Sequence, residues 1–224
     1  MSELSSHNLF HFTHSLDVLK LILKNGIRYS VVMERIPGAK LVYAVDAVCF
    51  CCIPLSSVNE HVFWYGPYGI GVRPSVLRQA GATPIIYAHP NSPFLKKGRG
   101  KLEYYQNDCP FTAYIKQIKG SQRRYGCHKP STKLFYDEKE WRLANRMTLN
   151  VYQQSDVGDL EQARRDLKSS SQKPESIPLP SEWIEYILVR FSNEKQTLSS
   201  WLQSEGMAVL SNRIISLEQI RKDF

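Results

Sequence analysis

Two acidic residues, with one residue between them, lie among aromatic residues in the second half of the chain. They are Glu138 and Glu140. The flanking aromatic residues are Phe135, Tyr136 and Trp141. On a strand, residues i and i+2 project to the same face, so both carboxylates could line one cleft. Such a pair suits a reaction through an oxocarbenium-like state, in which one carboxylate stabilises positive charge while the other handles the nucleophile. The alternative is a solvated edge strand whose glutamates pair with Lys139 and Arg142.

A histidine near the N-terminus is the second candidate for chemistry. His11 lies in the apolar run 9–12, shortly before a predicted helix. A neutral imidazole there can donate to a ribose hydroxyl or a carbonyl, and Thr13 can add a hydroxyl two residues on. The alternative is a core or edge histidine with no ligand.

The elements that must position these residues begin with a strand and a helix. Residues 17–25 have the apolar spacing of an amphipathic helix. Ser15 can cap its N-terminus, and Gly26 stands where a left-handed residue ends a helix. We therefore predict the order strand, turn, helix, stop, with His11 near the end of the strand.

The rest of the chain predicts many short strands and few helices. We expect strands at residues 48–53, 68–72, 83–88, 135–143, 148–152, 184–191 and 213–215. We expect helices at residues 76–80, 111–118 and 194–203. Residues 162–181 are polar and rich in serine and proline, which indicates a surface loop. This pattern predicts an α+β fold, formed as a single domain over residues 1–224.

Composition limits the class of protein. The chain has 224 residues, of which 42% are hydrophobic, without an apolar run long enough to span a bilayer. Its first residues do not have the pattern of a secretory signal, so we expect a cytoplasmic protein with no membrane partner. Five cysteines without a disulfide-like spacing agree with that compartment. A zinc site from Cys109, Cys127 and His128 is the alternative, but no C-x-x-C pair anchors it, and we expect no metal.

The positive charge of the chain is concentrated in one segment. Residues 94–133 hold ten basic and two acidic residues, an excess of eight that equals the formal net charge of +8. Five aromatic residues are interleaved with them, as in grooves that hold single-stranded nucleic acid. We predict a basic insertion that binds RNA or DNA through Lys96, Lys97, Arg99, Lys116, Lys119, Arg123 and Arg124. The alternatives are a protein acceptor, which a basic surface also attracts, and an ordinary wet surface over core aromatics.

Several blocks of the sequence resemble known families. Residues 9–13 (LFHFT), followed by a helix and residues 25–27 (NGI), resemble the opening of DarT-type ADP-ribosyltransferases. Further blocks, in the same order along the chain, resemble the abortive-infection family AbiGi. These blocks are residues 49–56 (CFCCIPLS), His61, residues 65–71 (YGPYGIG), residues 84–87 (PIIY) and residues 136–142 (YDEKEWR). Members of the AbiGi family are described as antitoxins.

The resemblance implies an ADP-ribosyltransferase-like fold, a split mixed β-sheet with peripheral helices that holds NAD⁺ in a cleft. It implies that His11, with Thr13, binds the adenosine-side ribose and that Glu140 stabilises the reacting ribose, with Glu138 facing the acceptor. An aromatic stacks on nicotinamide in that pattern, and Ser56, Tyr65 and Tyr68 compete for this middle position.

The function expected on this basis is NAD-dependent ADP-ribosyl transfer by a toxin or effector of anti-phage defence. Its target would be a nucleic acid, and its neutralising partner an antitoxin protein. The alternatives are a non-catalytic antitoxin or regulatory binding protein on the same fold, and a transferase that modifies protein.

Overall fold

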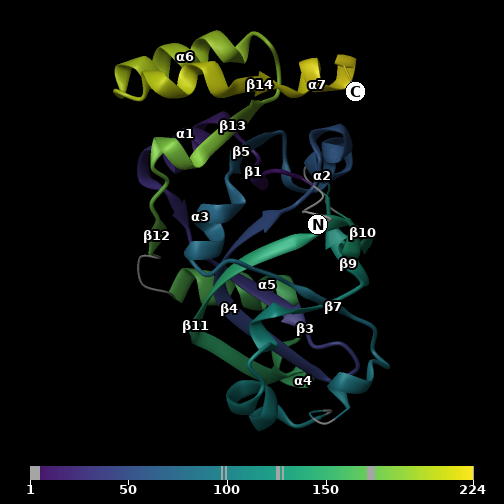
Figure 1. Cartoon of the computed structure of the whole chain (residues 1–224). Coiled ribbons are helices and arrows are strands. Elements are labelled where there is room, and N and C mark those ends of the chain that lie inside the picture. Colours follow the sequence, from purple (N-terminus) through teal and green to yellow (C-terminus); the bar gives the residue numbers. More distant parts are fainter. Residues whose placement is uncertain are drawn as a thin grey trace.

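A mostly antiparallel sheet forms the centre of the protein (Figure 1). The computed structural model describes residues 6–96, 98, 100–124, 127, 129–170 and 175–223. The strands of the central sheet are β1 (Leu9–Thr13), β3 (Ser30–Arg35), β4 (Leu41–Cys51), β5 (Tyr68–Val72), β6 (Thr83–Pro84), β11 (Glu140–Gln153), β13 (Ile184–Val189) and β14 (Ile214–Ser216). Their order is β14-β13-β5-β1-β4-β11-β6, with β3 beside β4. With helices at its periphery, the sheet confirms the predicted α+β class.

The sheet is almost interrupted between β1 and β4. Strand β1 pairs with β5 along its whole length, from Leu9 opposite Val72 to Thr13 opposite Tyr68. It meets β4 at a single position, Phe10 opposite Cys51. The two strands therefore diverge beyond this point, and the sheet has two halves that join at one edge.

Three two-stranded sheets lie beside the central one. Two of them are the β2–β12 pair (Ile27–Arg28 with Ser176–Ile177) and the parallel β7–β8 pair (Ile86–Ala88 with Ile115–Gln117). The third is an antiparallel ribbon of β9 (Lys119–Arg123) and β10 (Pro130–Leu134). This β9–β10 ribbon lies next to α2 in Figure 1.

The first helix forms as predicted. Helix α1 covers Leu16–Asn25, and the Ser15 hydroxyl accepts a hydrogen bond from the backbone N–H of Val18 at 3.2 Å. Gly26 ends the helix at a φ of 81°, where an added Cβ would lie 2.2 Å from the carbonyl oxygen of Ile177. Only glycine fits there, because both the dihedral angle and the close backbone exclude a side chain. The buried face of α1 packs against β5 and joins the largest group of buried apolar side chains of the sheet.

The other helices cover the periphery. They are α2 (Val58–Tyr65), α3 (Pro74–Gln79), α4 (Gln154–Val157), α5 (Leu160–Ser170), α6 (Glu194–Ser204) and α7 (Leu217–Asp223). Helices α6 and α7 lie with β14 at one end of the molecule, and α5 packs on β3 nearer the other end (Figure 1). Within the described residues, no helix combines the length and apolar character needed to cross a bilayer.

Four predicted elements are wrong. Residues 111–118 form a 3₁₀ turn and β8 instead of a helix, and residues 148–152, predicted as a strand separate from 135–143, are the second part of β11. Both parts of β11 pair with β4, and the bulge between Asn145 and Asn150 takes up the extra residues. Residues 162–170 of the predicted loop belong to α5; residues 171–174 lie outside the described residues. In α5 the charged residues sit on an exposed amphipathic helix, which polar composition alone does not separate from a loop.

The fourth correction concerns the acidic pair. Residues 135–143 are not one strand, because Phe135–Glu138 form a 3₁₀ turn and β11 begins only at Glu140. Between the two glutamates, Lys139 has φ 43° and ψ 50°, in the left-handed region. This residue separates the 3₁₀ turn from β11, so strand alternation does not relate Glu138 to Glu140.

The left-handed backbone conformation of Lys139 leads to a testable prediction. Its side chain is exposed, so substitutions there report on the backbone alone. We expect Lys139→Gly to change the free energy of unfolding by less than about 0.5 kcal/mol, because relief of the left-handed strain offsets the flexibility of glycine. Lys139→Val should cost about 2 kcal/mol, since a β-branched residue is disfavoured at this φ. Urea unfolding measures both, and equal losses for the two variants would contradict this role.

Candidate functional site

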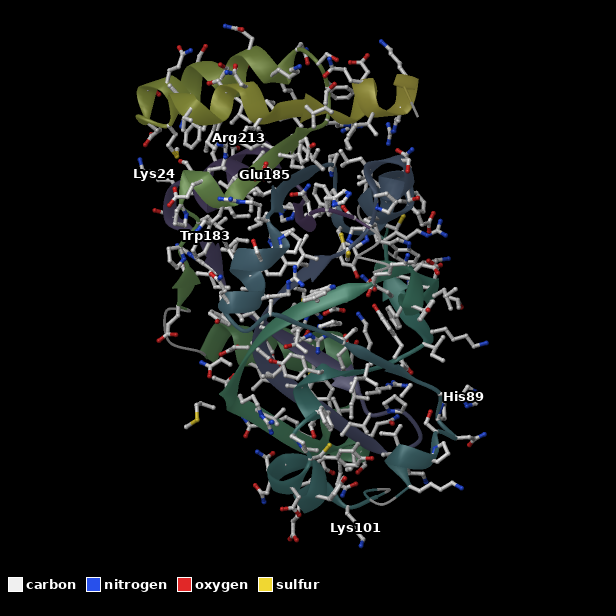
Figure 2. All side chains as sticks on the ribbon, in the orientation of Figure 1. Lys24, His89, Lys101, Trp183, Glu185 and Arg213 are labelled. Carbon is white, nitrogen blue, oxygen red and sulfur yellow. The ribbon has the colours of Figure 1, made fainter. Side chains whose placement is uncertain are left out.

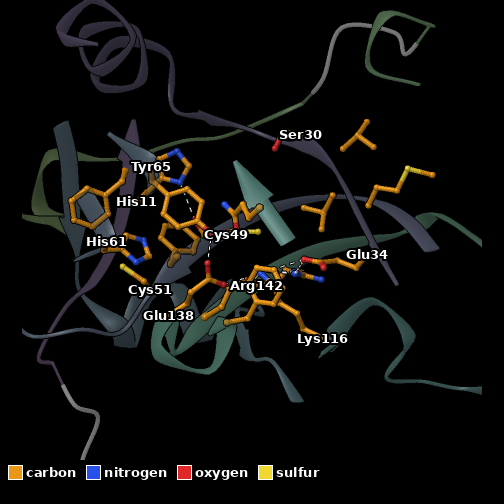
Figure 3. A pocket seen from close by; sticks show the side chains of 18 of the residues that line it. His11, Ser30, Glu34, Cys49, Cys51, His61, Tyr65, Lys116, Glu138 and Arg142 are labelled. Carbon is orange, nitrogen blue, oxygen red and sulfur yellow. Dashed lines mark hydrogen bonds and ion pairs between the residues drawn. The ribbon is translucent and has the colours of Figure 1, made fainter. Parts of the chain in front are cut away.

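A pocket of about 480 Å³ lies where β1 and β4 diverge. Strands β1, β3, β4 and β11, helix α2 and the β9–β10 ribbon all contribute side chains to it (Figure 3). His11 and Tyr65 lie at one end of the pocket, and Glu34 and Lys116 lie at the other. The pocket therefore brings together residues that are far apart in the sequence.

Six charged side chains form a connected set of ion pairs, called the charge network below, and all of them except Lys133 line this pocket. They are Glu34, Lys116, Lys133, Glu138, Glu140 and Arg142. All except Glu34 are nearly excluded from solvent. Three anions face three cations, so the network carries no formal net charge.

Lys116 is at the centre of the charge network. Its Nζ lies 2.8 Å from Glu138 Oε2, 2.9 Å from Glu140 Oε2 and 3.3 Å from Glu34 Oε1. One buried ammonium group therefore contacts all three carboxylates.

Arg142 clamps Glu140 from the other side. Its Nε and Nη2 donate to Glu140 Oε1 at 3.0 and 2.7 Å. The same guanidinium donates through Nη1 to the Tyr43 hydroxyl at 2.7 Å and to the carbonyl of Ala113 at 2.8 Å. Arg142 is fully buried, and these contacts compensate for the loss of its hydration.

Glu138 is held by the β9–β10 ribbon and by α2. Lys133 Nζ, from β10, lies 2.5 Å from Glu138 Oε1 and stands 4.1 Å from the ring centroid of Tyr65. The Tyr65 hydroxyl donates to the same Glu138 oxygen and lies 3.4 Å from Gln122 Oε1 of β9. Strand β9 and helix α2 therefore contact each other and together form one side of the pocket.

The pKa values of the glutamates follow from these contacts. Burial alone would raise the pKa of Glu140, but Arg142 and Lys116 outweigh it and hold that pKa well below its usual value. At Glu138, Lys116 and Lys133 likewise overcome burial and lower the pKa. At Glu34 burial dominates and raises the pKa, because its cations are more distant, at 3.3 and 3.6 Å. Glu138 and Glu140 are therefore both ionised at neutral pH.

The two histidines of the pocket are neutral. His11 Nδ1 lies 2.9 Å from the carbonyl oxygen of Cys49, and burial lowers its pKa. Burial also lowers the pKa of His61 to about 3, and its ring stacks near Tyr65 with centroids 4.6 Å apart. Both imidazoles can donate or accept hydrogen bonds without carrying charge.

Comparison with known protein families gives a match to part of the chain. Residues 39–177, more than half of the chain, match the family described as abortive phage resistance protein AbiGi, antitoxin. The chain belongs to the AbiGi family. A search of the curated proteins and a search of the solved structures each found no match. Membership of AbiGi implies a role in abortive phage infection, and the antitoxin in the family's description implies a toxin as partner.

The other residues that we expected to bind NAD⁺ lie in different places in this AbiGi fold. Thr13 is buried in β1 and does not line the pocket. Among the three candidates for the middle position, Tyr65 lines the pocket. The Tyr68 hydroxyl donates to Glu194 at 2.6 Å, away from the pocket, and Ser56 is exposed in a 3₁₀ turn. The AbiGi pocket thus unites His11, Tyr65, Glu138 and Glu140 and leaves out the other three.

The basic segment of the AbiGi chain does not form one surface stripe. Lys116, predicted to bind nucleic acid, is buried in the charge network, so it is not available to a phosphate backbone. Lys96 and Lys119 are exposed, and the Arg124 guanidinium stacks on Phe63. Lys97, Arg99 and the side chain of Arg123 lie outside the described residues. Lys101 lies near the lower end of the molecule in Figure 2, whereas the β9–β10 ribbon lies beside α2 in Figure 1.

The alternative zinc site is only partly described. Cys109 is buried and Cys127 is exposed, while His128 lies outside the described residues. In the described part of the chain, no three metal-ligating side chains come together.

Two residues of the AbiGi charge network, Glu34 and Lys133, and also His61 were not assigned a role of their own from the sequence, whereas Arg142 was named only as a partner of the glutamates on a solvated strand. Glu34 interrupts an apolar strand, Arg142 follows Glu140 at strand spacing, and Lys133 ends the basic segment. A charge inside an apolar strand was the available signal for Glu34, and strand spacing was the signal for Arg142. Nothing in the sequence distinguishes Lys133 from its exposed basic neighbours.

Proposed function

We propose that this protein is a non-catalytic antitoxin of abortive phage infection, built on an ADP-ribosyltransferase-like fold. The observation that carries the proposal is that buried cations occupy both oxygens of Glu140. Its Oε1 accepts from two N–H groups of Arg142, and its Oε2 accepts from the ammonium of Lys116. A ribose hydroxyl would have to compete with both cations for this carboxylate.

The charges of the network favour the same proposal. Stabilising an oxocarbenium ion requires negative potential at the reacting carbon. Here Lys116 stands 2.8 and 2.9 Å from the two glutamates, and a fixed ammonium beside the developing cation would oppose its formation. The charge network is better suited to stabilising the fold than to supporting glycosidic cleavage.

The ADP-ribosyltransferase-like fold is part of the proposal. It is supported by the divergence of β1 from β4, by His11 on the first strand and by the position of Glu140 at the start of β11. The pocket between the half-sheets also has Arg35 and Arg164 at its border, where a pyrophosphate would find cations. In this proposal the pocket keeps the shape of a nucleotide site without the free carboxylate of an enzyme.

A second candidate is an active NAD-dependent ADP-ribosyltransferase, modifying nucleic acid or protein. It is favoured by the convergence of His11, Tyr65, Glu138 and Glu140 in a single pocket. For this candidate, ligand binding would have to displace Lys116 from Glu140.

Incubation with NAD⁺ separates the two candidates. With NAD⁺ labelled in its adenylate part and separate pools of RNA, DNA and protein, we expect no label transfer. We also expect no nicotinamide release above the buffer blank, a readout that requires no knowledge of the acceptor. Label or nicotinamide that appears with the native chain and falls about 100-fold or more in Glu140→Gln would overturn the proposal in favour of the transferase.

Neutralisation in cells supplies the positive test. Co-expression of this chain with its toxin should restore growth, and His11→Gln should restore it equally, because neutralisation would not depend on bound NAD⁺. The transferase candidate expects His11→Gln to abolish the effect of this chain on growth. Melting temperatures of both proteins control for loss of folding.

A further inference from the structure

A second pocket of about 320 Å³ lies beside α2, on the other side of Glu138 and His61 from the first. One wall is helix α2, and the opposite wall is strand β10 of the β9–β10 ribbon. Ile53, Trp64 and Leu134 supply apolar surface, and Arg124 and Lys133 supply positive charge. Neither the expected NAD⁺ site nor the antitoxin proposal accounts for this pocket.

Within the described residues, the Arg124 side chain has a donor without an acceptor. Its guanidinium stands 4.2 Å from the ring centroid of Phe63 and 5.1 Å from that of Trp64, which fixes its plane against α2. Its Nε is buried and has no hydrogen-bond partner among the residues that the structure describes. A buried N–H of a charged group is costly to leave unpaired, so this side chain is suited to an incoming anion.

Apolar side chains border the same pocket on the surface. Phe63 is 45% exposed beneath Arg124, and Leu134 is 45% exposed at the end of β10. In addition, β10 pairs with β9 alone among the described strands. A strand with one unpaired edge can accept another extended chain through its main-chain groups.

We infer that Arg124, Leu134 and β10 form a docking surface for an extended acidic segment of a partner protein. A carboxylate of the segment pairs with the Arg124 guanidinium, and a neighbouring apolar side chain contacts Leu134. The inference names the surface through which the proposed antitoxin meets its toxin, and in that respect it rests on the proposed function.

The charges in the pocket favour a protein segment over a nucleic acid. Glu60, Asp137 and Glu138 line the pocket together with Arg124 and Lys133, and Lys133 is already paired with Glu138. A phosphate backbone brings a negative charge with every nucleotide and would meet these carboxylates. An acidic segment with apolar residues between its carboxylates brings fewer negative charges, and among the described lining residues Arg124 is the cation that no carboxylate already neutralises.

Fluorescence anisotropy with defined probes tests this surface. The probe is a labelled short peptide of alternating glutamate and valine, and the comparison probes are a lysine–valine peptide and a short oligothymidylate. We expect saturable binding of the acidic peptide alone. Arg124→Gln should weaken it roughly tenfold or more, as the loss of a charged hydrogen bond does. Leu134→Asn should also weaken it.

Matched controls exist on the same chain. Arg190 also stacks on an exposed phenylalanine, 4.6 Å from the ring of Phe191, so Arg190→Gln should leave binding unchanged. Met147→Asn is the exposed apolar control for Leu134. Equal binding by the Arg124→Gln variant, absence of acidic-peptide binding, or Arg124-dependent binding of oligothymidylate would each overturn the inference. Nicotinamide release would count against the proposed function alone, because the peptide measurement does not involve NAD⁺.

Discussion

Arg142→Met is expected to lower the free energy of unfolding by about 3–5 kcal/mol, the usual cost of removing one partner from a buried ion pair. The substitution keeps an unbranched side chain of similar length but leaves Glu140 with Lys116 as its remaining cation. It also leaves the carbonyl of Ala113 without its donor. Urea unfolding followed by circular dichroism measures the loss.

Two further variants show whether this loss of stability comes from the buried ion pair. Arg146→Met, on the exposed part of the same strand, should cost less than about 1 kcal/mol. Arg142→Met combined with Glu140→Met should cost less than the sum of the single changes, because the unpaired carboxylate is then gone. A loss in Arg142→Met no larger than in Arg146→Met would show that the charge network does not support the fold.

Lys116→Met is expected to cost about 3–5 kcal/mol at pH 7 and noticeably less at pH 5. In the native protein the folded pKa values of Glu138 and Glu140 lie below their unfolded values. Their contribution to stability is therefore complete above about pH 4.3 and is lost as the pH falls further. Without Lys116, three carboxylates share two cations, and the folded pKa of at least Glu34, already raised by burial, rises further.

Between pH 7 and pH 5, acidification should therefore stabilise the folded state of the Lys116→Met variant. A raised folded pKa means that the folded state binds protons more readily than the unfolded state, so acidification from pH 7 to pH 5 should reduce the deficit of Lys116→Met. Lys101→Met, at an exposed lysine, is the control and should show no such change. A deficit that is constant from pH 7 to pH 5 would contradict the role given to Lys116.

The elements that the sequence predicts well are those with local signals. Helix α1 has its cap at Ser15 and its glycine stop at Gly26, and both act within a few residues of the helix. Strand β5 and helix α6 likewise follow from short apolar patterns. Such signals depend on neighbours in the chain, so no knowledge of tertiary packing is needed.

The two glutamates line one pocket, but not for the reason that the sequence suggested. Glu138 and Glu140 do share a site, yet the left-handed Lys139 brings them together, not strand alternation. Lysine has no preference for that region of backbone space, so nothing in its identity indicated the turn. The hydrogen bond from Cys52 N–H to the Lys139 carbonyl, at 3.1 Å, depends on a distant segment.

The basic segment shows the limit of reading charge from sequence. Its excess suggested an external surface, yet Lys116 and Lys133 are internal counter-ions of Glu138. Formal charge does not report burial, and a lysine is rarely buried unless it is paired. The partners of Lys116 lie 22 and 24 residues ahead on the chain, and the third, Glu34, lies far behind it.

The charge network also constrains the order in which the chain folds. Its members come from β3, β8, β10 and β11 and from the 3₁₀ turn before β11. A single charge loses its hydration at high cost unless its partner arrives at the same time. We therefore expect partly folded chains to keep these six side chains in water, and the charge network to lose its water late in folding and in a single step.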